Sequence, residues 1–380
     1  MKRPRHRLLC IAAFAALPAL GAQAQQPAAS SPQPAPQTET PAPDGATPAA
    51  DESMLTRQER SPWLLVPLLS SGPKLGTSLG GMVGYILRLD GQSEPSMLGI
   101  QAKRSNTGSE VVGAGGKLYF NANRDRVGIG LVGGKASNDY QDFLGSGQEV
   151  RSDETMRAMF LRYQHSFWPN WYVGVQGVRS NYGVDGVDPV SDLILDEAGL
   201  VGVDAAGLGL IVTYDSRDNL HNPSNGVLGQ LYNVAYRDSL GGDVSYDIYN
   251  ADWRWYLRTG SNNVVAFHAV ARWTEDAPAS REATVQLRGY TRGQYLGKNS
   301  LSFEAENRYS FNVHWGAKAF AGVACLYGDG KSCGGDQLYP MVGLGGYYVL
   351  KPKENMLISV DYAKGSGDNH GLYIRFGHSF

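Results

Sequence analysis

Three short stretches of the chain carry residue types that could do chemistry. Residues 76–80 have the spacing of a serine nucleophile elbow, 128–133 the glycines of a dinucleotide-binding loop, and 330–332 the end of a phosphate-binding P-loop. The first two motifs need a helix directly after them, and here none is expected, since Ser78 falls on the polar face of an alternating strand. Cys325 stands where the P-loop needs a glycine. We therefore expect no enzymatic reaction.

Cysteine and histidine residues do not form a metal-binding pattern either. Clusters with metal-ligand spacing are absent from the sequence, so we expect neither a metal nor another cofactor. Cys325 and Cys333 are separated by seven residues rich in turn formers. In an oxidising compartment this pair is expected to form a disulfide across a loop tip, with two free thiols as the alternative.

The N-terminus indicates export from the cytoplasm. Residues 1–24 contain four basic residues, then an apolar segment over 8–20, then the small-x-small cleavage pattern that ends at Ala24. We expect Sec-type export and signal cleavage near Ala24. Cys10 lies inside the apolar segment, so lipidation is not expected. Removing the four basic residues changes the net charge from −2 to −2 − 4 = −6, and such a chain has no evident affinity for nucleic acid.

The segment after the signal peptide has a composition that does not fold. Residues 25–60 are rich in proline and alanine, especially up to Asp51, and poor in aliphatic side chains. They cannot bury enough apolar surface to offset the loss of chain entropy, so we expect a disordered periplasmic leader. A plain spacer is the favoured interpretation, and contact with peptidoglycan or a partner is the alternative.

Residues 301–311 show most clearly the pattern that dominates the rest of the chain. Apolar and polar side chains alternate along this segment, and a period of two residues predicts a β-strand. In a soluble sheet the apolar face would cover a core. In a membrane barrel it would face lipid, and the polar face would line the lumen.

About sixteen such segments follow one another between residues 63 and 380. With 48 glycines, 21 tyrosines and only 18% charged residues, the composition favours an all-β fold. No long apolar run follows residue 24, which excludes a polytopic helical membrane protein. Connections alternate between short turns, such as 121–124, and long polar loops, such as 136–154. This asymmetry is typical of outer-membrane barrels, so we predict a transmembrane antiparallel β-barrel of about 16 strands over 61–380.

The two ends of the predicted barrel differ in regularity. Alternate residues over 372–380 share one apolar face, on which Phe376 and Phe380 form a C-terminal strand signal. A last strand must pair, and closure onto the first strand removes both edges. Residues 63–69 do not alternate, and Pro67 lacks the N–H that a ladder needs. We therefore expect a poorly bonded seam between the first and last strands.

Four motifs occur in a fixed order in the predicted barrel: Asp215-Ser216-Arg217-Asp218-Asn219 with Pro223 and Gly226, then Leu287-Arg288-Gly289-Tyr290, then Glu304-Ala305-Glu306-Asn307-Arg308, and finally Phe380. This set, spread over Ser61 to Phe380, resembles the bacterial surface antigen barrel of the BamA/TamA superfamily of outer-membrane assembly factors. In that family an Arg-Gly-Phe/Tyr triplet lies in the sixth extracellular loop, which folds back into a sixteen-stranded barrel. Arg288 falls between the eleventh and twelfth predicted strands, inside a long polar connection from about Thr274 to Ser300.

The resemblance implies roles for these residues. Arg288, Gly289 and Tyr290 would be the loop-6 motif, and Glu304, Glu306 and Asp361 are the inward carboxylates that could hold Arg288. An exposed Arg288 is the alternative. Asp215, Arg217, Pro223 and Gly226 would form a periplasmic hairpin motif, although they would also make a good turn without any such role.

Two departures from the family pattern limit what is carried over. The leader is too short for a POTRA module, so this chain is expected to be a short form. Gly322 stands where many members have an acidic residue. The resemblance still implies a protein that assists insertion or translocation of proteins or lipids through a weak seam. Its partners would be outer-membrane lipid, envelope clients and the cell's own barrel-assembly machinery. A passive pore or structural barrel is the alternative.

Overall fold

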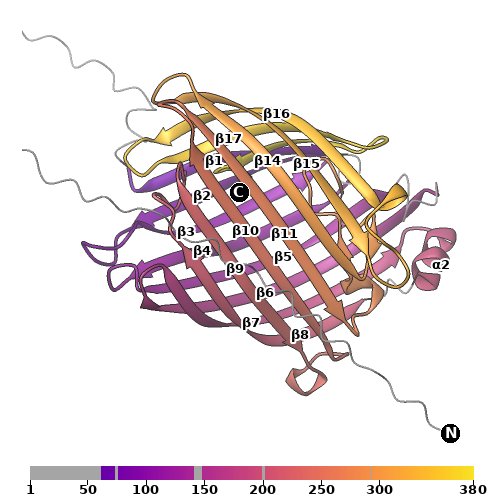
Figure 1. Ribbon diagram of the computed structural model, residues 1–380. Helices are drawn as coiled ribbons and strands as arrows, with labels where there is room; N and C mark the ends of the chain where they lie inside the picture. Colours follow the sequence, from indigo (N-terminus) through magenta and orange to yellow (C-terminus); the bar gives the residue numbers. More distant parts are fainter. Residues whose placement is uncertain (1–60, 73–75, 141–147, 199–201, 292) are drawn as a thin grey trace, which may run out of the picture. The chain divides into compact units, whose positions relative to one another are not determined.

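The computed structural model describes residues 61–72, 76–140, 148–198, 202–291 and 293–380, so the predicted signal peptide (1–24) and leader (25–60) lie outside the described residues. Sixteen strands form a closed antiparallel barrel in which consecutive strands pair and β18 returns to β1 (Figure 1). The predicted fold class is confirmed.

The barrel strands are β1 (Trp63–Gly72), β2 (Gly76–Leu87), β3 (Ser96–Ser105), β4 (Glu110–Phe120), β5 (Asp125–Tyr140), β6 (Val150–Trp168), β7 (Trp171–Gly186), β8 (Val203–Asp215), β9 (Gly226–Tyr236), β10 (Tyr246–Arg258), β11 (Asn263–Glu275), β14 (Asn299–Ser310), β15 (Trp315–Tyr327), β16 (Leu338–Lys351), β17 (Met356–Gly365) and β18 (His370–Phe376). Within the described residues, the connections hold α2 (Pro189–Glu197), 3-10 turns at Asp238–Leu240, Ala279–Arg281 and Gly335–Gln337, and a small sheet of β12 (Ala283–Thr284) and β13 (Leu296–Gly297).

Large apolar side chains cover the outer face of the barrel. On β8, Leu210 is 63% exposed whereas its neighbour Ile211 is fully buried, as expected when successive side chains point to opposite faces. Aromatic side chains gather at the end that carries the short turns, as in the girdles of membrane barrels. The ring pairs there are Trp63–Tyr85, Trp171–Tyr214 and Trp315–Tyr348. None of the helices among the described residues is long and apolar enough to cross a membrane.

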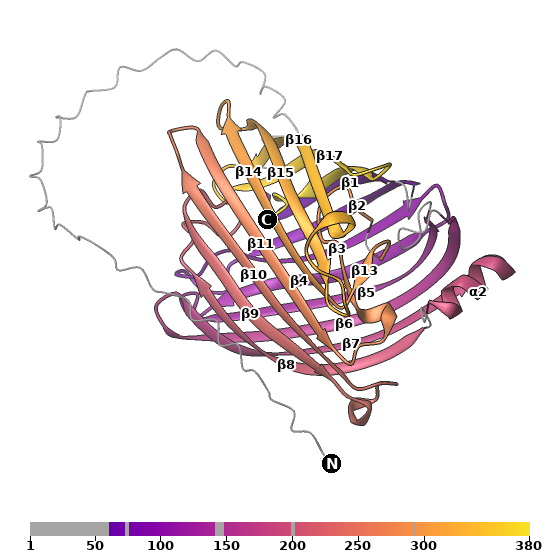
Figure 2. The ribbon, with the colours of Figure 1, turned by 45° about the vertical axis from the view of Figure 1, so that its right-hand side comes forward.

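Two predicted connections contain more secondary structure than expected. The segment 136–154, predicted as a loop, continues the β5–β6 ladder as far as Tyr140 and Val150. The described residues of this segment up to Tyr140 and from Val150 are therefore paired strand residues. Helix α2 lies in the next long connection and projects beyond the ends of β6 and β7 (Figure 2). The sequence contains two residue types that favour a helix start here, an aspartate at the N-cap position and a proline directly after it. Asp188 accepts a hydrogen bond from the Ser191 N–H at 2.9 Å, and Pro189 begins the helix.

Candidate functional site

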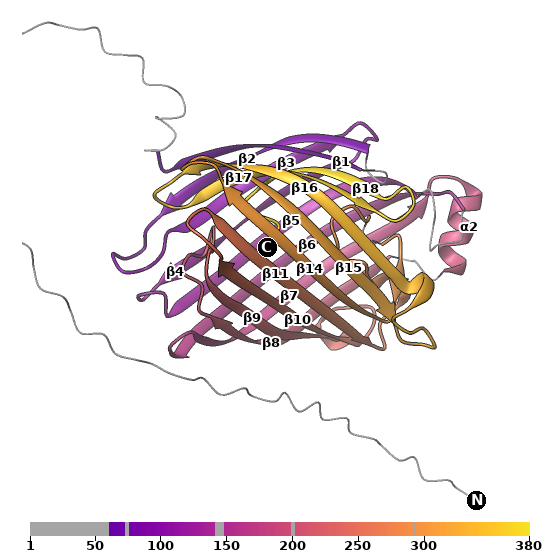
Figure 3. The ribbon, with the colours of Figure 1, turned by 45° about the horizontal axis from the view of Figure 1, so that its top comes forward.

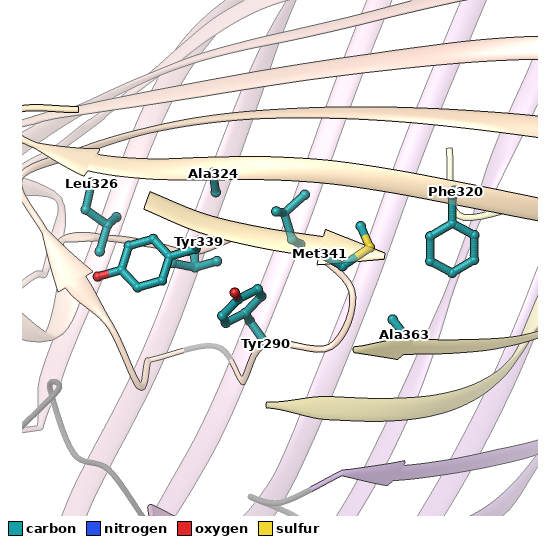
Figure 4. Packing of buried hydrophobic residues seen from close by; sticks show 9 residues of the cluster. Tyr290, Phe320, Ala324, Leu326, Tyr339, Met341 and Ala363 are labelled. Atoms are coloured by element: carbon teal, nitrogen blue, oxygen red, sulfur yellow. The ribbon is translucent and has the colours of Figure 1, made fainter. Parts of the chain in front are cut away.

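The connection between β11 and β14, residues 276–298, folds into the barrel interior. Although it was expected to be polar, Val285, Leu287 and Tyr290 are buried in one apolar cluster with residues of β15, β16 and β17. Figure 4 shows Tyr290 within this cluster, which also includes Phe320 and Met341. Apolar burial therefore anchors the connection against the inner face of the wall.

Gly289 and Tyr290 fit the backbone and the space available. Gly289 has a φ of +89°, a conformation that favours glycine, and its N–H donates to the Tyr373 hydroxyl at 2.9 Å. The Tyr290 hydroxyl donates to the Pro340 carbonyl at 2.7 Å. A Cβ on Gly365 would lie 2.6 Å from the Tyr290 ring, so glycine is needed there for the ring to dock.

Arg288 contacts all three carboxylates that were considered as its partners. Its Nη1 donates to Asp361 Oδ2 at 3.0 Å, its Nη2 lies 2.8 Å from Glu306 Oε2, and the same nitrogen donates to Glu304. Arg288 is 6% exposed and Asp361 fully buried, so these are desolvated ion pairs. Leaving any one carboxylate unpaired there would be costly.

Three further residues contact this ion cluster, although none of them was predicted as a member. Lys318 Nζ lies 2.8 Å from Asp361 Oδ1, and Arg308 Nε donates to Glu306 Oε1 at 2.7 Å. The Phe320 ring lies 3.3 Å from Arg288 Cζ, a cation–π contact. With Arg308 and Lys318, three cations face the three side-chain carboxylates. The alternation of side chains along β14 and β15 was the signal in the sequence that could have placed these residues on the inner face.

Gly322 makes room for the folded connection. It pairs with Glu304 across β14 and β15, and a Cβ on it would lie 3.3 Å from Leu287 Cδ2 and 2.8 Å from the Phe303 oxygen. The absence of a side chain therefore lets the connection pack against the wall, and Glu304 faces Arg288 from the neighbouring strand.

The predicted hairpin motif lies between β8 and β9. Asp215 accepts from Arg217 Nε and from Arg126 Nη1, each at 2.8 Å, so β5 also takes part in this contact. Gly226 has a φ of +104°, and Pro223 is buried. The motif thus forms both a turn and the ion pair between Asp215 and Arg217. The second partner of Asp215, Arg126, lies outside the motif and was not predicted.

The seam between β1 and β18 has few ladder pairs. Among the described residues these strands pair only at Ser70 with Tyr373 and at Ser71 with Leu372, whereas β1 pairs with β2 along its whole length (Figure 3). Burial alternates along the first strand although its sequence does not alternate in polarity: Leu64, Val66 and Leu68 are buried. These three side chains pack with Leu350, Ile358 and Phe376, so most of the seam is held by side chains and not by backbone hydrogen bonds.

The C-terminal residues depart from the predicted strand. β18 ends at Phe376, and Gly377, with a φ of +81°, turns the chain inward. Phe380 does not continue the face of β18 that carries Phe376. It is buried with Tyr256, and its backbone oxygen accepts from Arg308 Nη2 at 2.7 Å. The prediction that the chain stops inside its last strand is therefore wrong. The prediction failed because apolar and polar residues keep alternating in the sequence beyond Phe376, where the pairing of β18 ends.

Cys325 and Cys333, the pair considered for a disulfide, are joined by one in the structure. The bond closes the connection between β15 and β16. Among the described residues, no group of three His, Cys, Asp or Glu side chains could hold a metal ion.

No family model and no curated protein matches the sequence. Among solved structures, the fold is similar to BamA from Haemophilus ducreyi lacking POTRA domains 1-3, with a TM-score of 0.53, 13% identity, and coverage of 84% of this chain and 70% of that chain. It is also similar to CdiB from Acinetobacter baumannii (TM-score 0.55, 11% identity, 83% and 59% coverage) and CdiB from Escherichia coli (0.53, 13%, 82% and 62%). The chain thus spans less than two thirds of each CdiB chain. The likeness is one of fold, that of Gram-negative outer-membrane barrels.

Proposed function

We propose that this chain is a non-enzymatic outer-membrane barrel of the BamA type, which assists the insertion or translocation of envelope proteins or lipids at its seam. It would reach the Gram-negative outer membrane by Sec-type export and would itself be folded by the cell's barrel-assembly machinery. The carrying observation is that β1 and β18 pair at only two positions among the described residues. Separating such strands breaks few hydrogen bonds, so the wall opens most easily there.

The buried ion cluster supports the same proposal. Arg288 joins the connection 276–298 to Glu304 and Glu306 on β14 and to Asp361 on β17. A polar network of this kind specifies one position for the connection even where it adds little net stability. The wall next to the seam would then keep its shape while the seam opens.

A covalent lock across the seam tests the proposal. Ser71→Cys with Leu372→Cys joins a directly paired position of β1 and β18, and Ser71→Cys with Thr77→Cys joins the fully paired β1–β2 ladder as the matched control. We expect oxidation of the first pair alone to abolish insertion of a test barrel, or movement of lipid, in proteoliposomes. Equal activity of both oxidised variants would refute a role for the seam.

A passive pore is the alternative, and one observation favours it. The interior contains a cavity of about 740 Å³ lined by Lys117 and several arginines. Planar-bilayer recording separates the two functions. A steady anion-selective conductance, unchanged by the seam lock and lost on substitution of these cations, would favour the pore.

A further inference from the structure

The cavity of about 740 Å³ lies away from the ion cluster of Arg288, on the side of the barrel formed by β2 to β10. Five cationic side chains line it, namely Lys117, Arg126, Arg162, Arg217 and Arg254. No carboxylate among the described residues lines it. A low-dielectric wall around charges of one sign concentrates ions of the opposite sign.

Two carboxylates outside the lining compensate only part of this charge. Asp215 pairs with Arg126 and Arg217, and Asp252 pairs with Arg254 at 2.8 Å. The five cations and these two carboxylates leave a net charge of 5 − 2 = +3. Two of these three charges lie on Lys117 and Arg162, and the third lies on the group in which Arg126 and Arg217 share Asp215.

Lys117 and Arg162 are directed at open space. Among the described residues Lys117 has no ion-pair or hydrogen-bond partner, and although it points into the barrel it is exposed, so its amine faces the cavity. Arg162 donates to a neutral acceptor, Gln176 Oε1, from Nε at 3.0 Å and from Nη2 at 2.6 Å. Two cations in one cavity are thus left for an external anion.

The glycines of 128–133, which do not form a dinucleotide-binding loop, help to keep this space empty. Gly128 and Gly130 line the cavity, and a Cβ on Gly130 would lie 3.7 Å from Phe160 Cδ1, an ordinary contact. Packing therefore does not demand glycine at 130. The missing side chains widen the lumen beside Lys117 and Arg162.

We propose that this cavity binds a phosphate-bearing anion, either free or carried as the headgroup of a lipid. Guanidinium groups match phosphate oxygens in paired hydrogen bonds, and four of the five cations are arginines. The volume lies in the range of ligand pockets. Met82, Met97 and Phe376 give the cavity an apolar wall that reaches the seam, along which an acyl chain would lie. The inference does not depend on any activity at the seam.

Binding is tested on the mature full-length protein in detergent at low salt. Inorganic pyrophosphate is titrated calorimetrically, and retention of phosphatidylglycerol against phosphatidylcholine is followed by native mass spectrometry from mixed micelles. Pyrophosphate binding alone identifies a site for free phosphate, retention of phosphatidylglycerol alone a site for lipid, and either result supports the proposal. Added salt should weaken both. Failure of both probes to bind would overturn it.

Paired variants assign the binding to the cavity. Lys117→Gln with Arg162→Gln should weaken binding about tenfold for each cation removed. Lys135→Gln with Arg157→Gln removes the same charge from side chains that do not line the cavity and should bind like the wild type. Gly130→Leu keeps every charge and should weaken binding by filling space. Heat-modifiable migration on gels checks that each variant folds. Equal affinities of the two double variants would refute the site.

Discussion

Arg288, on the connection between β11 and β14, donates to Asp361 on β17 at 3.0 Å across the barrel interior, although 73 residues separate them in the sequence. The contact is one of three that the guanidinium makes with buried carboxylates. A single side chain thus links this long connection to two different strands of the wall, β14 and β17. We therefore expect the loss of Arg288 to disturb the connection 276–298 more than the loss of any surface ion pair would.

Arg288→Ala should lower the free energy of unfolding by about 3–5 kcal/mol, because it leaves buried carboxylates without their cation. Urea unfolding in detergent, followed by the gel migration of unheated samples, measures the change. Arg104→Ala removes a guanidinium that is 3.3 Å from Glu110 on the exposed surface, and should cost at most about 1 kcal/mol. Similar losses in both variants would mean that burial of the pair is unimportant.

Gly365→Ala should release the connection 276–298 without removing any charge. The new Cβ would lie 2.6 Å from the Tyr290 ring, so the ring must move, at about 1–3 kcal/mol. We expect faster proteolysis of 276–298 in the folded barrel. Gly260→Ala, in the turn between β10 and β11 with open space around it, is the matched control. Unchanged cleavage of the Gly365 variant would contradict this packing.

The wall of the barrel was predictable from the sequence because its information is local. Alternation along segments such as 301–311 identifies a strand and its two faces, and closure of about sixteen such strands follows from the need to pair both edges. Arg308 and Lys318 could be placed on the inner face in the same way. Glu304, Glu306 and Asp361 could be named as candidate partners of Arg288, and the structure brings all three to it. That Arg308 and Lys318 join them was not predictable, since the stagger of distant strands and the docking of Arg288 decide it.

The misplaced elements have local causes as well. Phe380 follows the alternation of β18, but Gly377 at positive φ breaks the strand before it. The polar residues of 136–154 resemble a loop, yet those up to Tyr140 and from Val150 continue the β5–β6 ladder. At residues 376–380 and in 136–154, the alternation of apolar and polar side chains ends at a different residue from the backbone pairing of the strand.

The disulfide between Cys325 and Cys333 should leave no free thiol in the mature folded chain. Alkylation and mass measurement should modify neither cysteine before reduction and both after it. With a sequence separation of 8, loop-closure entropy predicts a loss of about 2–3 kcal/mol on Cys333→Ser. Full alkylation of the folded, unreduced protein would contradict the bond.

His221, on the connection between β8 and β9, should make the barrel less stable in acid. Burial, and then the positive charges of Lys117 and Arg217, lower its pKa to about 4 from the ordinary 6.5. Between these two pH values the unfolded chain binds a proton that the folded chain does not, so the free energy of unfolding falls as the pH falls from 6.5 to 4. The loss should reach on the order of 2–3 kcal/mol.

Urea unfolding over this pH range measures how steeply the free energy of unfolding changes with pH. This slope should be shallower for His221→Gln, whereas His370→Gln, which removes an exposed histidine, should keep the wild-type slope. Identical slopes in all three proteins would show that His221 takes up its proton equally in the folded and unfolded states.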